Sequence, residues 1–293
     1  MTKKKKIKKA VLPVAGLGTR FFPATRAQPK EMLPVVDKPV VQYIVEECIQ
    51  SGIEEIIFVT GRNKRAIEDH FDYLPEFEEA LLKNGMFESL KEFDDLRKMI
   101  SFTYVRQDKQ LGNGHALLCA EKAVNGQAFV FCNADDLIYA KEPAIRQMLR
   151  AYYKNEIVEE MIGVIEVAKQ QVVKCGVIKA SYPDKKDREV FEVEAIVEKP
   201  KIEKAPSNLA NPGRYILTPS IFEALRETEP GIGGEIWISD AFSNLGKNKP
   251  IYACRIEGKR YDCGNKLEYL KAVVDFAKMN GEFGRDFRRW LEK

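Results

Sequence analysis

Short apolar segments alternate with helical patterns along the first half of this 293-residue chain. The expected strands are Lys9–Ala15, Glu55–Thr60, Ser101–Arg106 and Gln127–Cys132. The helical patterns between them cover Pro39–Ser51, Lys64–Phe71 and Gly112–Ala120. Strands that alternate with helices at this spacing form βαβ units, and near-continuous apolar strands are typical of a sheet buried on both faces. The pattern predicts an α/β fold with a Rossmann-like, mixed but mostly parallel sheet flanked by helices.

The second half of the chain has shorter connections between its apolar runs. Strands, some of them antiparallel, are expected over Met161–Val167, Gly176–Ala180, Glu189–Glu198 and Arg214–Leu217. The polar segment Lys179–Arg188 contains Pro183 and predicts the tip of a β-hairpin. Helices are expected over Pro219–Glu227, Glu235–Gly246, Asn265–Lys278 and Phe283–Leu291. Because no linker or repeat interrupts the chain, we expect a single domain with a basic tail (1–8), two halves (9–140 and 141–262) and C-terminal helices (263–293).

Composition excludes several classes of protein. The 47 Lys and Arg residues nearly balance the 44 Asp and Glu residues, whereas an electrostatic nucleic-acid binder needs a strong basic excess. No apolar run is long enough to span a membrane or to form the core of a signal peptide. Six cysteines without a C-x-x-C pair predict reduced, mostly buried thiols of a cytoplasmic protein. The lysines of segment 3–9 predict a solvated tail.

A glycine-rich loop, Gly16–Arg20, follows the first expected strand. Consecutive backbone N–H groups in such a turn form an anion site, and Arg20 and Lys30 add positive charge. Phe21 stands where both a Walker A loop and a dinucleotide-binding fingerprint need glycine. The loop therefore indicates a phosphate site of another kind, with a tight turn that binds nothing as the alternative.

Two adjacent acids, Asp135 and Asp136, follow the fourth expected strand. Ligands of parallel sheets bind at the carboxyl ends of the strands, which is also where the glycine-rich loop lies. The acids could ligate a metal there, or they could merely cap a turn.

The stretch Gly16–Val35 (GLGTRFFPATRAQPKEMLPV) resembles the signature of the sugar-phosphate nucleotidyltransferases, G-x-G-T-R-x-x-P-x-T followed by Lys and Pro. The likeness continues through Asn63–Phe71, Arg106–Gln107, Leu111–Ala116, Glu198–Pro200, Ala205–Ala210 and Tyr261–Lys266. It covers roughly residues 8–292. It implies the nucleotidyltransferase fold, with a nucleotide-binding half (9–140) and a sugar-phosphate-binding half (141–262).

The resemblance also implies a reaction. A phosphate oxygen of glucose 1-phosphate would attack the α-phosphorus of UTP, forming UDP-glucose and releasing pyrophosphate. The nucleophile is already an anion, so the site needs positioning and charge stabilisation rather than a general base, in keeping with only two histidines in the chain. Mg²⁺ is the implied cofactor. A homodimer or homotetramer is also implied, with no nucleic-acid or membrane partner.

The family pattern assigns roles to individual residues. Charge stabilisation at the phosphates is implied for Arg20, Lys30 and Lys199. Nucleotide contacts are implied for Ala15, Gly16, Leu17, Gly18, Thr19, Glu31, Gln107 and Gly112. Sugar contacts are implied for Gly176, Glu198 and Lys199. Metal ligation is implied for Asp135 and Asp262.

Three departures from the family pattern leave the substrate open. Asn133-Ala134 precede the acids where glycine is common, Cys175 replaces an aromatic residue, and Glu235–Asp240 lacks the usual Gln-Leu-Thr centre. The last two changes could reshape the sugar pocket. A thymidylyltransferase, a uridylyltransferase for another hexose 1-phosphate and an inactive UDP-sugar-binding paralogue remain alternatives. Packing alone is expected of His115, Trp237 and Trp290.

Overall fold

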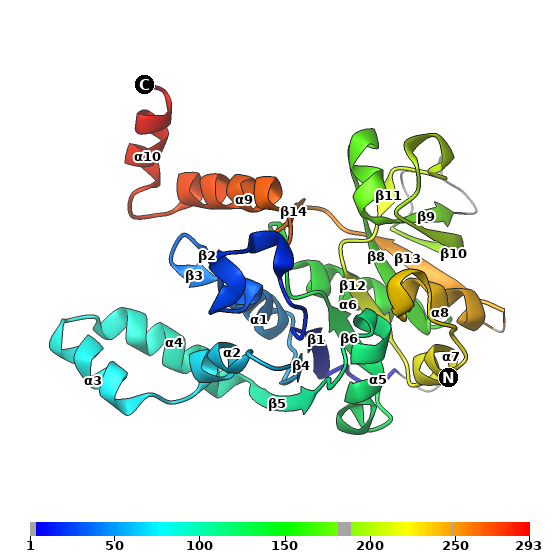
Figure 1. Cartoon of the computed structure of the whole chain (residues 1–293), viewed down its shortest axis with the longest axis horizontal. Coiled ribbons are helices and arrows are strands. Elements are labelled where there is room, and N and C mark those ends of the chain that lie inside the picture. Colours follow the sequence, from blue (N-terminus) through cyan, green and yellow to red (C-terminus); the bar gives the residue numbers. More distant parts are fainter. Residues whose placement is uncertain (1–3, 181–188, 248) are drawn as a thin grey trace.

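One mixed sheet organises the fold. The computed structural model describes residues 4–180, 189–247 and 249–293 (Figure 1). Among these residues, ten strands pair in the order β11-β9-β10-β13-β8-β12-β6-β1-β4-β5. Their bounds are β1 Lys9–Pro13, β4 Glu55–Thr60, β5 Ser101–Arg106, β6 Phe129–Cys132, β8 Glu160–Glu166, β9 Gly176–Ala180, β10 Val190–Glu198, β11 Leu209–Ala210, β12 Arg214–Leu217 and β13 Ile251–Arg255. Strands from both halves of the chain therefore share one sheet.

Parallel pairing dominates the first half of the chain. Strands β6, β1, β4 and β5 are parallel neighbours. Helix α1 (Val40–Gln50) connects β1 to β4, and helix α5 (Gly112–Val124) connects β5 to β6. In the second half, β8 and β13 are parallel, whereas the other recorded pairs are antiparallel. The predicted α/β class with a mixed sheet and β-hairpin elaborations is confirmed. The sheet is not mostly parallel, because four of its recorded strand pairings are parallel and six are antiparallel.

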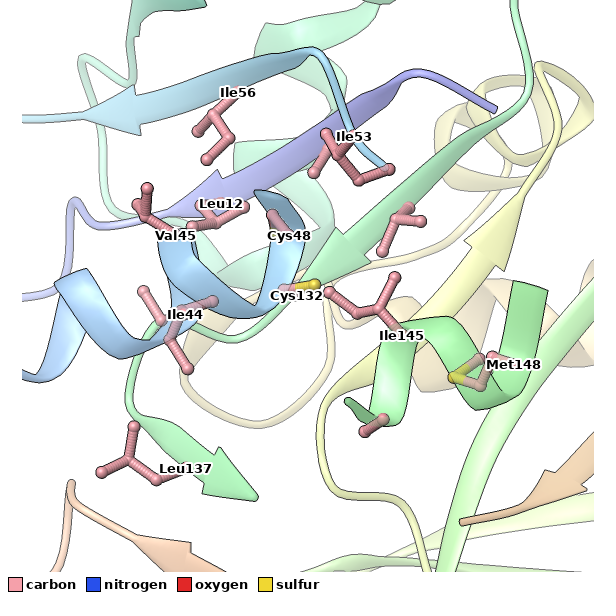
Figure 2. Close-up of a cluster of buried hydrophobic side chains, with 14 of the residues drawn as sticks. Leu12, Ile44, Val45, Cys48, Ile53, Ile56, Cys132, Leu137, Ile145 and Met148 are labelled. Atoms are coloured by element: carbon pink, nitrogen blue, oxygen red, sulfur yellow. The ribbon is translucent and has the colours of Figure 1, made fainter. Parts of the chain in front are cut away.

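Helices cover both faces of the sheet because successive strand residues point to opposite sides. Leu12 and Ile56 join the buried cluster under α1 and α6 (Ala144–Lys154), as Figure 2 shows. Their sequence neighbours Val11 and Ile57 join a second cluster. The helices of that cluster are α5, α7 (Ser220–Arg226) and α8 (Ile238–Leu245). The glycine-rich loop and the Asp pair thus leave the sheet from strands held rigidly between two packed layers.

Several elements escaped prediction from the sequence. They are α3 (Pro75–Lys83), α4 (Phe87–Met99), α6, β13 and the ribbon strands β7 (Asp136–Tyr139) and β14 (Lys259–Asp262). Helix α6 carries a clear apolar stripe after Pro143, so the helical period was readable there. Helices α3 and α4 are mostly exposed and rich in charged residues. Their sequences therefore lack the regular spacing of apolar residues that indicates a helix.

The remaining elements complete the chain. They are β2 (Pro34–Val35), β3 (Lys38–Pro39), α2 (Arg65–Phe71), α9 (Lys266–Met279) and α10 (Gly284–Leu291). Strands β9 and β10 form the arms of the predicted hairpin, with Ala180 opposite Val193. The predicted tip, residues 181–188, lies outside the described residues.

The prediction of a solvated lysine tail is confirmed for Lys5, Lys6 and Lys8, which are exposed, but it is wrong for Lys4. The Lys4 ammonium donates to the carbonyls of Tyr152, Asn155 and Val158 at 2.9, 2.6 and 2.5 Å, and it lies over the Tyr152 ring. These carbonyls lie at and just beyond the C-terminus of α6, where a cation is favourable. Lys9 donates to the carbonyl of Ala123 at the end of α5. Lys4 holds the segment before β1 against the folded body, and Lys9 ties the first residue of β1 to the end of α5.

Two composition-based expectations can be compared with the structure. Five of the six cysteines are buried, Cys119 is intermediate, and all are free. Within the described ranges, every helix is too short or too polar to cross a lipid bilayer.

Candidate functional site

A cavity of about 630 Å³ opens at the carboxyl ends of β1, β5 and β6. Every residue that the sequence analysis assigned to a site lines it: Ala15, Gly16, Leu17, Gly18, Thr19, Arg20, Lys30, Glu31, Gln107, Gly112, Asp135, Gly176, Glu198, Lys199 and Asp262. The two halves of the chain contribute opposite walls, because β9 and β10 reach the cavity from the far part of the sheet. The folded chain therefore brings together residues almost 250 positions apart in sequence.

The glycine-rich loop forms one wall. Gly18 has a φ of +69°, and a Cβ on it would lie 3.1 Å from Cβ of Lys30, so a side chain here would be strained and crowded. The Thr25 hydroxyl donates to the Gly18 carbonyl at 2.7 Å and closes the turn. Thr19 and Arg20 are exposed to the cavity. The backbone here can approach an anion closely.

A row of alternating charges runs from beneath this loop into the cavity. The buried Lys64 ammonium lies 2.8 Å from Glu31, and Lys30 lies 3.9 Å from Glu31 and 2.5 Å from Asp135. Burial alone would lower the pKa of Lys30, but the Asp135 and Glu31 carboxylates raise it overall. Burial opposes ionisation of Asp135, yet the Lys30 ammonium and Arg20 hold its pKa below the usual value. Lys30 and Asp135 are therefore both charged.

Strands β7 and β14 bring the two predicted metal ligands together. They pair antiparallel with Asp262 opposite Asp136, and the N–H of Cys263 donates to the Asp135 carbonyl at 2.8 Å. A Cβ on Gly264 would lie 2.7 Å from Asp135 Oδ2, 2.8 Å from Arg20 Nη2 and 3.0 Å from Asp262 Oδ1. The missing Cβ leaves an opening onto which two carboxylates converge. Such a pair fits Mg²⁺, which takes one or two protein carboxylates and completes its shell with substrate oxygens.

Asp136 does not share this opening. Its carboxylate accepts from Arg260 Nε at 2.7 Å and lies 2.5 Å from Arg260 Nη2. Burial raises the pKa of Asp136 to about 6, against the opposing charge of Arg260. Arg260 Nη1 also donates to Cys175 Sγ at 3.1 Å. Asp136 thus fixes Arg260, and Arg260 connects the β7–β14 ribbon to the start of β9.

A buried ion pair fixes the loop that carries Asp135. Arg214 is fully buried in β12, and its Nη2 lies 2.7 Å from Glu47 Oε2 on α1. The same guanidinium donates to the carbonyls of Asn133 and Asp136, at 3.3 and 2.8 Å, so it spans the loop on both sides of Asp135. Glu47 also accepts from the N–H of Ile145. The pair therefore connects α1, α6 and β12 to the loop that carries Asp135.

The nucleotide end of the cavity contains a fixed amide. Gln107 is buried, and its Nε2 lies 3.1 Å from the Gly112 carbonyl and 3.0 Å from His115 Nδ1. These contacts occupy the amide nitrogen and leave Oε1 as an acceptor. His115 was expected only to pack, but its ring orients Gln107. The amide can read a ligand edge that presents an N–H donor.

The opposite end contains the residues predicted to hold a sugar phosphate. Gly176 pairs with Glu198, and a Cβ on it would lie 2.9 Å from Glu198 Oε2, so only glycine leaves that carboxylate in place. Burial raises the pKa of Glu198 despite the neighbouring Lys199. Lys199 itself has a φ of +45°, rare for a side-chain-bearing residue. Its ammonium lies 4.6 Å from the centroid of the Trp237 ring.

Some site residues were missed or misassigned from the sequence. Trp237 lines the cavity, so the expectation that it only packs is wrong, and Trp290 is 65% exposed on α10. Arg260 also lines the cavity. It directly precedes the motif Tyr261–Lys266, which contains Asp262. A single arginine in the apolar strand RYIL was a readable signal for a buried pair at Arg214, but nothing in the sequence named Glu47 as its partner.

Comparisons with known proteins agree with this geometry. The family described as nucleotidyl transferase matches residues 9–279. The UTP–glucose-1-phosphate uridylyltransferase YngB of Bacillus subtilis is 45% identical over 289 residues, which cover 99% of this chain and 96% of that protein. A UTP-bound UGPase structure from Acinetobacter baumannii is 36% identical and has a TM-score of 0.89, covering 98% of this chain and 99% of its own. A structure of UDP-glucose pyrophosphorylase complexed with UDP-glucose is 43% identical, with a TM-score of 0.84 and coverage of 94% and 100%.

The buried pair generates a stability prediction. Arg214→Met leaves Glu47 buried without its cation, which should lower the free energy of unfolding by about 3–5 kcal/mol. Denaturant titration of the variant measures the change. Arg226→Met is the matched control, because the Arg226–Glu121 pair is largely exposed and should contribute about 1 kcal/mol or less. Equal effects of the two substitutions would contradict the assigned importance of the buried pair.

Proposed function

The chain belongs to the nucleotidyl transferase family, and on this premise we propose that it transfers a uridylyl group from UTP to glucose 1-phosphate. The products are UDP-glucose and pyrophosphate. The observation that carries the proposal is the cavity itself. It combines a glycine-rich loop, the positive charges of Arg20 and Lys30, two converging carboxylates and a lysine–glutamate pair at the far end. Full-length relatives named for this reaction support the choice of UTP and glucose 1-phosphate.

The reaction needs little from the protein beyond placement. A phosphate oxygen of glucose 1-phosphate forms a bond to the α-phosphorus of UTP, and the bond from that phosphorus to the bridging oxygen of pyrophosphate breaks. The attacking oxygen is already anionic, so no residue has to remove a proton. Lys199 would hold the incoming phosphate, while Arg20 and Lys30 would stabilise the charge on the triphosphate. Gln107 would read the uracil N3–H with Oε1.

Magnesium completes the proposal. Asp135 and Asp262 would hold the ion at the opening beside Gly264. An Mg²⁺ ion held there would neutralise part of the charge on the substrate phosphates. Lys30 contacts Asp135, so its ammonium partly balances that carboxylate.

A substrate panel tests the function. Purified protein is incubated with Mg²⁺, glucose 1-phosphate and either UTP, dTTP, ATP, CTP or GTP, and pyrophosphate release is measured. UTP should give the highest turnover, and chelation of the metal should abolish it. Absence of turnover with UTP would overturn the proposal. A preference for dTTP or for another hexose 1-phosphate would instead favour the related transferase, and binding without turnover would favour an inactive paralogue.

Loss of a metal ligand should affect rate far more than folding. Asp135→Asn removes a charge that faces the transferring phosphate and should lower kcat by about 10²-fold or more. Asp108→Asn, at an exposed position outside the cavity lining, is the matched control and should leave kcat within about twofold because exposed substitutions rarely matter. A folded Asp135→Asn protein with near-normal kcat would contradict the assigned role.

We also propose a cytoplasmic homo-oligomer. The free, mostly buried thiols support a reducing compartment. For assembly, α10 presents exposed Arg285 and Arg289, whereas α3 presents exposed Glu76 and Glu79. Both helices project from the same side of the molecule (Figure 1). A second copy related by a two-fold axis can set its acidic α3 against the basic α10 of the first.

Light scattering tests the assembly. The unmodified protein should elute as a dimer or larger species, and Arg285→Glu with Arg289→Glu should shift it toward monomer. Combining these changes with Glu76→Lys and Glu79→Lys should restore the larger species, because the complementary charges are then exchanged. A monomeric unmodified protein would contradict the proposed assembly.

A further inference from the structure

Trp237 lies on a segment that is fixed on both sides. The Ile236 N–H donates to the Leu111 carbonyl at 2.8 Å, and the Gly114 N–H donates to the Ile236 carbonyl at 2.9 Å. The Ile238 N–H donates to Asn113 Oδ1 at 3.1 Å. The backbone on either side of the indole is therefore bound to the N-terminal turn of α5.

Two glycines permit this close approach. A Cβ on Gly112 would lie 2.5 Å from the Ile236 carbonyl oxygen, and a Cβ on Gly114 would lie 2.8 Å from the same atom. Any larger residue at either position would push the segment away from α5. The side chain of Trp237 is thus placed in the cavity wall by a rigid support that reaches to the nucleotide end.

The indole meets the lysine of the opposite half. The Lys199 ammonium lies 4.6 Å from the centroid of the Trp237 ring, while its distance to Glu198 Oε1 is 3.6 Å. The ring face is electron-rich and attracts a cation. The Lys199 backbone is held in its unusual conformation by its own N–H, which donates to the Cys175 carbonyl at 3.0 Å. The ammonium therefore contacts both the ring and the Glu198 carboxylate.

We propose that Trp237 is a positioning and specificity residue for the sugar phosphate. Its ring holds the Lys199 ammonium where the sugar phosphate binds, and its face forms the wall against which the hexose ring packs through its C–H groups. Glu198 pairs with Lys199 through Oε1, and Oε2 would accept hydrogen bonds from sugar hydroxyls. This inference rests on the proposed function, and it assigns to Trp237 a contact that the sequence pattern did not predict.

Tryptophan fluorescence tests the contact without catalysis. The chain has two tryptophans, and Trp290→Phe leaves Trp237 as the sole emitter. This protein is titrated with UDP-glucose and, separately, with UDP. UDP-glucose should change the intensity or wavelength of emission clearly more than UDP does, because only UDP-glucose places a hexose against the ring. Equal changes with both ligands, or no change under conditions where calorimetry shows UDP-glucose binding, would overturn the proposal.

Kinetics test the positioning role. Trp237→Gln removes the ring and should raise KM for glucose 1-phosphate by about tenfold, the size expected when a partly desolvated cation–π contact is lost. KM for UTP should stay within about twofold. Trp237→Phe keeps an aromatic face and should recover most of the loss. Equal KM values for Trp237→Gln and the unmodified enzyme, or a Trp237→Phe variant as impaired as Trp237→Gln, would refute the role.

The two proposals fail differently. If the unmodified protein shows no turnover with UTP, the proposed function fails, and the fluorescence titration with UDP-sugars still decides whether Trp237 meets a sugar. If turnover is normal but the emission and KM results are negative, only the role of Trp237 fails.

Discussion

The buried pair between Arg214 and Glu47 is the interaction on which the site depends. Removing two charges from water is costly, and the cost is offset only when both partners are fully hydrogen-bonded. Here the guanidinium has carboxylate and carbonyl partners on all three nitrogens. Burial alone would lower the pKa of Arg214, but Glu47 raises it overall. Arg214 joins β12 of the second half to α1 of the first half. It also hydrogen-bonds the loop on both sides of Asp135.

Other charged side chains of the cavity surround the loop that Arg214 holds. The Asp135 loop is held from below by Arg214 and from the side by the β7–β14 ribbon, where Asp136 binds Arg260. In front of it, Lys30, Glu31 and Lys64 alternate in sign, and together with Asp135 these charges balance one another. An incoming triphosphate can therefore exchange partners with charges already in place. Such preorganisation reduces the reorganisation that the reaction requires.

Much of this arrangement was predictable from the sequence. The period of apolar residues predicted the parallel strands of the first half, and every residue that the motifs assigned to a site lines the cavity. The motifs did not identify Trp237 or Arg260, which line it as well. Local sequence patterns could not predict contacts between residues that lie far apart in the sequence. Glu47 and Arg214 are separated by 167 positions, and Trp237 meets Lys199 only because β10 and the segment before α8 face one cavity. The position of Lys4 was not predicted for the same reason, since the carbonyls that bind it lie at and just beyond the C-terminus of α6.

Crystallography of the protein with UDP-glucose and Mg²⁺ tests the central claim most directly, namely that one cavity holds nucleotide and sugar at opposite ends. The account predicts density for uracil beside Gln107, for phosphates between the glycine-rich loop and Lys30, and for the hexose between Glu198 and Trp237. The ion should lie between Asp135 and Asp262. A ligand bound in the reverse direction, or outside this cavity, would contradict the account.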